Sequence, residues 1–416
     1  MSSKLLKIND PIHDFIIFPD FISKIVDSQE IQRLTRVRQL AGANYVFPGA
    51  NHTRFEHSIG VAALAQRLMN NLVTIHNASL TKDDINDCIV AGLCHDIGHG
   101  PFSHNFESIY LKYLKKDHED FTHWLITNSE LGDILTDLGF DKLYIANLAT
   151  GRSSNTNFPK GLLIGQIIAS AFNVDSMDYL LRDNYHCGTK GNSIDLDRLL
   201  LGIDEIEDGI LGIDIRALFS LEGFLLARIN SFRTIYFHKT CRAVQLMTTA
   251  AIEQIIDESN IINYKTPEDF IYWDDYMLWA ELVHNKKSSP YMDKIKRRQL
   301  LKLCYESKSS LEQMEINADD IKKELNKITG IPLKDIFFDS PSSPNVPYSH
   351  MAETRQSDIY TFERNGTKKT PVNLEDYTIF SNQFKGHLNL FRIYTWPQFR
   401  KSLTEASIKI FKTYSK

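Results

Sequence analysis

The chain has 416 residues, enough for one large or two ordinary domains. Apolar residues make up 43% of the sequence and charged residues 24%, which is typical of a soluble globular enzyme. The formal net charge of -5 argues against a protein whose whole surface is basic and binds nucleic acid.

The cysteines and the N-terminal segment indicate the cellular compartment of the protein. Five cysteines are widely spaced, and no Cys-x-x-Cys pair occurs. This pattern argues against a disulfide framework or a thiolate zinc site, and it favours a reducing compartment. The N-terminal segment carries charges every few residues, and no apolar run approaches the roughly 18 residues of a membrane span. We therefore expect a cytoplasmic protein without membrane contact.

Helical spacing of apolar residues dominates from about Ile22 to Leu325, without a fixed repeat. Loop-like composition interrupts it at residues 151–161, and a second break with three prolines follows at residues 339–350. Around the second break the sequence predicts short strands at Ile336–Asp339, Asp358–Phe362, Tyr377–Phe380 and Leu390–Thr395, and a closing helix at Pro397–Tyr414. The predicted fold is mainly α, with a helical body over residues 1–325 and a small α+β appendage over residues 326–416.

Three amphipathic segments each carry potential metal ligands next to an apolar helical face. The faces are His57, Val61, Leu64, Leu68 and Leu72; then Ile85, Ile89, Leu93 and Asp96, with His95 beside them; and last Ile164, Ile168, Ala171 and Asp175. We expect the third segment to form one helix from Ile164 to Asp178. Two imidazoles and two carboxylates are thereby placed on faces that should be buried.

A buried carboxylate without a partner costs several kcal/mol, and a divalent cation would offset that cost for all four groups. Each residue alone has an ordinary explanation, such as a hydrogen-bonded core histidine or a capping aspartate. The run CHDIGHGPFSH favours the metal, because it places His95, Asp96, His99 and His104 within ten residues.

Four blocks of the sequence resemble those of HD-domain deoxynucleoside triphosphate triphosphohydrolases. The blocks are NDPIH (9–13), RQLAGANYVFPGANHTRFEHSIGV (38–61), CHDIGHGPFSHNFE (94–107) and VDSMDYLLRD (174–183). In that family the histidine of RFEHS, the HD pair and the first aspartate of the D-x-x-D-Y block hold one divalent metal ion. The resemblance therefore implies the ligands His57, His95, Asp96 and Asp175, and it leaves Zn, Mn, Fe and Mg open.

The resemblance also implies roles around the metal. Arg54 and His99 would contact the phosphates, His104 would face the scissile ester, and His118 with Glu119 would take part in catalysis. The residues implied to read the sugar are Gln39, Tyr179, Asp183 and Tyr236, of which the last would crowd the 2′ position. The family further implies a homo-oligomer.

Some positions depart from the family pattern. Ser176 stands where eukaryotic members have a lysine directed at the phosphates. Thr35 stands where the family's regulatory nucleotide pocket has an arginine. Other positions of that pocket match the family pattern, namely Asp27, Gln32, Arg198, Arg298 and Lys302. A regulatory nucleotide is therefore left open.

The implied reaction is attack of water on the α-phosphorus of a dNTP, which releases a deoxynucleoside and inorganic triphosphate. Two alternatives stay open. One is another HD nucleotide phosphatase or phosphodiesterase that uses the same metal. The other is an HD protein that binds single-stranded nucleic acid and has weak activity, supported by the basic stretch at Asp293–Lys302.

Overall fold

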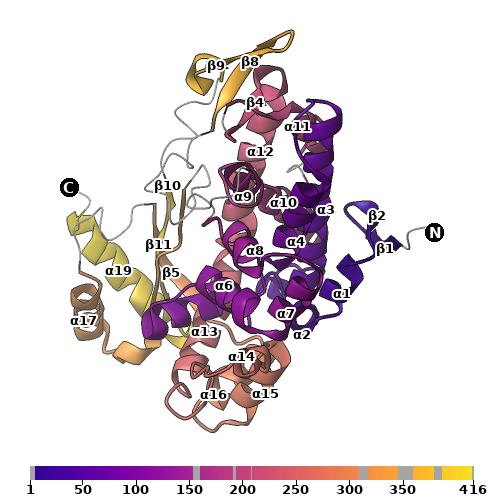
Figure 1. Cartoon of the computed structure of the whole chain (residues 1–416). Coiled ribbons are helices and arrows are strands. Elements are labelled where there is room, and N and C mark those ends of the chain that lie inside the picture. The colour runs from indigo at the N-terminus through magenta and orange to yellow at the C-terminus, as the bar shows by residue number, and fades with distance from the viewer. Residues whose placement is uncertain are drawn as a thin grey trace.

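The computed structural model describes residues 5–152, 160–190, 194–207, 209–308, 317–344, 359–378 and 387–414. A large helical body carries small sheets at its periphery (Figure 1). This architecture confirms the predicted fold class, mainly α with a small α+β part toward the C-terminus. Among the described helices, none is long and apolar enough to cross a membrane.

The chain begins with an antiparallel hairpin, β1 (Leu5–Asp10) and β2 (Asp14–Pro19), which lies at the edge of the molecule beside the N-terminus (Figure 1). The inner face of the hairpin packs on the body through Ile16 and Phe18, which are buried. Its outer face exposes large apolar side chains, namely Leu5, Phe15 and Ile17.

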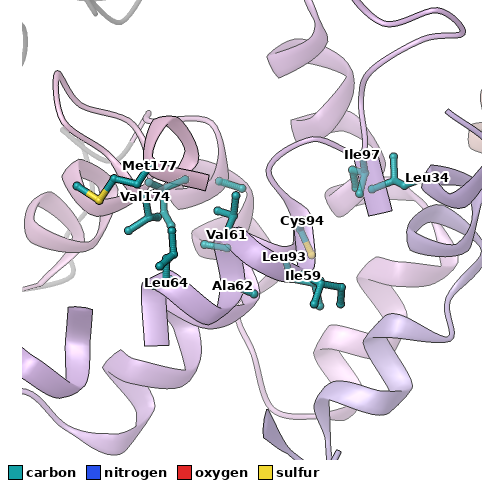
Figure 2. Packing of buried hydrophobic residues seen from close by; sticks show 14 of the residues in the cluster. Leu34, Ile59, Val61, Ala62, Leu64, Leu93, Cys94, Ile97, Val174 and Met177 are labelled. Carbon is teal, nitrogen blue, oxygen red and sulfur yellow. The ribbon is translucent and has the colours of Figure 1, made fainter. Parts of the chain in front are cut away.

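The helical body contains these α-helices in chain order: α1 (Ile22–Val26), α2 (Gln29–Arg33), α3 (Arg54–Thr74), α4 (Lys82–Cys94), α5 (His104–Ile109), α6 (His118–Asn128), α7 (Glu130–Asp137), α8 (Lys142–Ala149), α9 (Gly161–Ile168), α10 (Val174–Cys187), α11 (Leu196–Gly202), α12 (Leu218–Ser231), α13 (Lys239–Glu253), α14 (Pro267–Ile271), α15 (Asp275–His284) and α16 (Ser289–Lys296). Helix α3 packs against both α4 and α10. Figure 2 shows part of this core, where Val61 and Leu64 of α3 lie near Val174 and Met177 of α10.

The first two predicted apolar faces are buried against this core, apart from Ile85, which is partly buried. The expected single helix from Ile164 to Asp178 is wrong. Helix α9 ends at Ile168 and α10 begins at Val174, because the side chain of Asn173 accepts the backbone N–H of Ser176 at 2.7 Å and starts a new helix. Asp175 therefore lies in the first turn of α10.

The C-terminal part contributes most of a three-stranded antiparallel sheet in the order β5 (Lys302–Ser307), β11 (Phe391–Thr395) and β6 (Ile336–Asp339). Helix α19 (Arg400–Tyr414) packs on this sheet and against α17 (Ala318–Thr329). The strand predicted at Ile336–Asp339 is confirmed, and that at Leu390–Thr395 is confirmed to within one residue.

A second sheet has the order β3 (Ile203–Glu205), β4 (Leu211–Asp214), β8 (Thr361–Asn365) and β9 (Lys368–Val372), with β4 and β8 parallel. Strand β8 begins three residues later than predicted, and Tyr377 and Thr378 do not form a strand. Within the second predicted break, β7 (Ser342–Pro344) pairs with β10 (His387–Asn389). Residues 153–159, 345–350, 358 and 379–380 of the predicted loops and strands lie outside the described residues.

Candidate metal centre

The four predicted ligands come from helix ends that meet. His57 lies in the first turn of α3, His95 and Asp96 directly follow α4, and Asp175 lies in the first turn of α10. Nε2 of His57 is 3.0 Å from Oδ1 of Asp175 and 3.6 Å from Oδ2 of Asp96. Nε2 of His95 is 3.3 Å from Oδ1 of Asp96 and 3.6 Å from Oδ1 of Asp175. The ligand atoms of His57, His95 and Asp96 thus lie within 4.8 Å of one another, and Asp175 lies beside both imidazoles.

The contacts of Nδ1 in both imidazoles are those of metal-binding histidines. Nδ1 of His95 lies 2.8 Å from the carbonyl oxygen of Gly92, and its Nε2 is buried without a hydrogen-bond partner among the described residues. Nδ1 of His57 lies 2.7 Å from Oδ2 of Asp178, which leaves its Nε2 facing the other carboxylates. A second ring nitrogen that donates to an oxygen is the usual arrangement of a metal-binding histidine. This donor set fits one divalent cation.

The charges of the site point the same way. Burial raises the pKa of Asp96, but the Arg54 guanidinium and the nearby imidazoles reverse this and hold it well below its usual range. Burial likewise opposes ionisation of Asp175, but the nearby imidazoles of His57 and His95 lower its pKa nonetheless. Burial disfavours the charged form of His57, yet hydrogen bonds to Asp175 and Asp178 raise its pKa to about 10. Both carboxylates are thus ionised, and a cation bound between them would displace the Nε2 proton of His57.

Asp178 supports the centre from behind and was not among the predicted residues. Besides His57 it binds the guanidinium of Arg182, at 2.8 Å to Oδ2 and 2.9 Å to Oδ1. Helix α3 passes close to the Asp178–Arg182 pair at Gly60. A Cβ on this residue would lie 1.9 Å from Oδ1 of Asp178, so a glycine is needed here. The sequence signal was the i, i+4 spacing of Asp178 and Arg182 on α10.

Arg54 lies between the centre and the loop after α4. It donates from Nη1 to Oδ2 of Asp96 and from Nε to Oγ of Ser103, the latter at 2.7 Å. Its Nη2 is buried and has no hydrogen-bond partner in the described chain. A buried guanidinium N–H without an acceptor is costly. An anionic group of a ligand would satisfy it, which supports the predicted phosphate contact.

His99 and His118 form a stacked pair beside Asp96. Their ring centroids are 4.0 Å apart, and Nε2 of His99 lies 3.4 Å from Oδ1 of Asp96. Helix α6 reaches this position because Gly98 has no Cβ, which would lie 2.1 Å from the carbonyl oxygen of His118. Nδ1 of His118 lies 2.6 Å from Oε1 of Glu107, a residue that the sequence prediction missed.

The two stacked imidazoles differ in charge. Burial, together with Arg54 and His118, lowers the pKa of His99 well below its usual value. Burial also acts against the charged form of His118, but the hydrogen bond and charge of Glu107 raise its pKa to about 9. One ring is thus neutral and the other protonated, so His118 can donate a proton. The potential ligand atoms of Asp96, His99 and His118 lie within 4.8 Å of one another, so these three residues form a further group that could hold a metal ion.

Of two further predicted catalytic residues, the structure describes Glu119 in full and His104 in its backbone alone. Glu119 is half-buried at the second position of α6, next to His118. His104 is the first residue of α5, and its side chain lies outside the described part of the structure. Its role at the scissile ester stays a prediction.

The predicted sugar-reading residues are linked to one another. Tyr179 and Asp183 follow Asp175 at intervals of about one turn on α10. Tyr236 donates its hydroxyl hydrogen to Oδ2 of Asp183 at 2.6 Å, and its ring stands edge-on to Tyr179 with centroids 6.2 Å apart. Gln39 donates its backbone N–H to the carbonyl oxygen of His52 at 3.1 Å, and its side-chain oxygen is buried without a partner in the described chain.

Two further residues of this group were missed. Nε2 of His52 lies 2.7 Å from Oδ1 of Asp183, so His52 connects Asp183 with the backbone of Gln39. Arg228 on α12 donates from Nη1 to the hydroxyl of Tyr179. Neither contact could be read from the sequence, because the partners are more than 40 residues apart in the chain.

Comparison with known families agrees with this geometry. The HD domain matches residues 54–183, which contain all four predicted ligands, and the HD associated region matches residues 194–367. A hypothetical protein from Aquifex aeolicus has a similar structure, with a TM-score of 0.78 and 25% identity over 97% of this chain and 100% of that one. A phosphohydrolase from Bacteroides thetaiotaomicron shares the fold with a TM-score of 0.76 and 24% identity, over 94% of this chain and 100% of that one.

Curated relatives include the deoxynucleoside triphosphate triphosphohydrolase SAMHD1 homolog of Dictyostelium discoideum, which is 32% identical over 80% of this chain and 66% of its own length. Deoxynucleoside triphosphate triphosphohydrolase SAMHD1 of Bos taurus is 39% identical over 46% of this chain and 37% of its own length. The chain belongs to the HD-domain family, with an HD domain followed by an HD associated region. It spans no more than about two thirds of either triphosphohydrolase.

In this HD-domain protein the basic stretch at Asp293–Lys302 is not one continuous helical face. Helix α16 ends at Lys296, and Arg298 adopts a φ of 55° and donates to the carbonyl oxygen of Tyr45 at 3.0 Å. Lys294 lies over the ring of Trp396, 3.4 Å from its centroid. Several of these cations therefore already have partners within the chain.

Proposed function

We propose that this HD-domain protein is a phosphohydrolase that converts dNTPs to deoxynucleosides and inorganic triphosphate. The observation that carries the proposal is the arrangement along α10. Asp175, Tyr179 and Asp183 follow one another at one-turn intervals, so one helix links the metal centre to the group predicted to read the sugar. A substrate that spans both must have its reacting phosphorus next to a sugar, as the α-phosphate of a nucleotide does.

A divalent cation at the four ligands would act as a Lewis acid on the phosphate and lower the pKa of a bound water. The chain supplies the remaining functions. The open Nη2 of Arg54 is placed to bind a phosphate oxygen, and neutral His99 can donate a hydrogen bond beside it. His118, protonated and oriented by Glu107, can deliver a proton, a role that we also propose for His104 at the leaving 5′-oxygen.

Incubation of the purified protein with each dNTP and NTP in the presence of Mn²⁺ tests the proposal. Product analysis should find a deoxynucleoside and intact triphosphate, because attack is at the α-phosphorus. Monophosphate with pyrophosphate, or diphosphate with orthophosphate, would instead indicate a different HD reaction. A gel shift with single-stranded RNA tests the remaining alternative. Tight RNA binding together with weak hydrolysis would indicate a protein that mainly binds nucleic acid.

A further inference from the structure

The turn of the β1–β2 hairpin holds one histidine in a fixed inward position. Oδ1 of Asp10 accepts the backbone N–H groups of Ile12 and His13, each at 2.9 Å. Asp14 closes the turn with a φ of 56°. This side-chain turn fixes the backbone locally, and the His13 side chain is 7% exposed.

A continuous chain of hydrogen bonds runs from this turn to the metal centre. Nε2 of His13 lies 2.6 Å from Oδ1 of Asp178, whose Oδ2 lies 2.7 Å from Nδ1 of His57. Arg182 ties the same two elements together, since it binds Asp178 and also both oxygens of Asp10, at 2.9 and 3.3 Å. A movement of the turn therefore changes the partners of Asp178, which orients a predicted metal ligand.

The tip of the hairpin is otherwise weakly supported. A cavity of about 650 Å³ lies behind it, lined by residues 11–17 and by residues of α3, α10 and the segment 194–197. The outer face is open as well, with Phe15 76% and Ile17 48% exposed. The contacts of His13 and Asp10 are therefore a main attachment of the tip to the body.

We propose that His13 is a positioning residue for the metal, so that docking of the β1–β2 hairpin and binding of the cation stabilise each other. The inference rests on the metal centre of the proposed function, but not on its substrate or reaction. Loss of a group that orients a metal ligand costs about 10- to 100-fold in metal affinity. Because coupling between two equilibria is reciprocal, bound metal must also hold the hairpin more firmly.

The affinity for Mn²⁺, measured by competition with a chelator, tests the first half. His13→Ala should weaken binding by about 10-fold, the lower end of this range, because Arg182 still holds Asp178. His13→Gln should restore most of it, because the glutamine amide reaches about as far as Nε2 and can donate to Asp178. Phe15→Ser changes the same hairpin on its exposed face and should leave the affinity unchanged. A thermal melt of each metal-free variant separates lost affinity from lost folding.

Hydrogen exchange of residues 5–19, measured in the wild-type chain and in His13→Ala, tests the second half. Mn²⁺ should slow exchange in the hairpin, and it should do so less in His13→Ala. Equal Mn²⁺ affinity of His13→Ala and wild type, or hairpin exchange that ignores the metal, overturns the inference alone. Wild-type protein that binds none of Mn²⁺, Zn²⁺ and Fe²⁺ overturns the metal centre and the inference with it.

Discussion

Tyr236 is tied to Asp183 by a hydrogen bond of 2.6 Å that turns its hydroxyl toward α10. The other oxygen of Asp183 is held by His52 at 2.7 Å, so both oxygens of the carboxylate have protein partners. The aromatic ring itself is left as the wall next to Tyr179. Selection against ribose at this wall would therefore rest on the ring, and the hydroxyl would serve to orient it.

Replacement of Tyr236 separates these two roles. Burying an unpaired 2′-hydroxyl costs about 1–3 kcal/mol, so the wild type should favour dATP over ATP in kcat/KM by about one to two orders of magnitude. Tyr236→Ala should admit ATP and retain the metal. Tyr236→Phe should keep the preference for dATP over ATP. Its kcat/KM on both nucleotides should fall, because Asp183 loses a hydrogen-bond donor. If Phe were as permissive as Ala, the steric explanation would be wrong.

Removal of one metal ligand should abolish the centre. His95→Ala or Asp96→Ala leaves three ligands of a four-ligand set, and both bound metal and hydrolysis should be lost. Elemental analysis of purified wild type should find close to one divalent transition ion per chain. His284→Ala, an exposed histidine on α15, is the matched control and should keep metal and activity. Hydrolysis that survives exhaustive chelation would contradict the assignment.

The structure brings His57, His95 and Asp96 together because each adjoins an apolar helical face that had to be buried, whereas the face predicted for Asp175 is divided between two helices. His57 and Asp96 are buried together with their faces, which a period of 3.6 residues reveals. The supporting contacts were not predictable in this way. The bond from His13 to Asp178 spans 165 residues, and the parallel pairing of β4 with β8 joins strands about 150 residues apart. Such contacts depend on tertiary packing, which local periodicity does not encode.

Stability should depend on pH through Asp87 on α4, away from the metal centre. Burial and the neighbouring carboxylates of Asp84, Asp83 and Asp141 raise the pKa of Asp87 to about 7 from 3.8. The folded chain thus holds this proton more tightly than the unfolded chain does. The free energy of unfolding should therefore fall as the pH rises from 3.8 to about 7.

Asp87→Asn removes this dependence. The variant should match the wild type near pH 4 and exceed it above pH 7, by on the order of 1 kcal/mol after allowance for solvent screening of a partly buried group. Urea unfolding of both proteins at several pH values measures the difference. A variant that is less stable than the wild type at pH 8 would show that the charged carboxylate is stabilising.

Activation by a guanine nucleotide should be weak, because no guanidinium is available at the predicted regulatory position. Thr35 donates its hydroxyl hydrogen to the carbonyl oxygen of Gln32 at 2.6 Å. The next residue, Arg36, cannot readily replace the missing arginine, since its Nε donates to Asp274 at 2.6 Å. We expect GTP to raise the initial rate of dATP hydrolysis less than about tenfold, or roughly 1.4 kcal/mol of coupling. Thr35→Arg restores the cation and should increase the response. A stronger activation of the wild type, lost in Arg36→Ala, would show that Arg36 leaves Asp274 to bind the nucleotide.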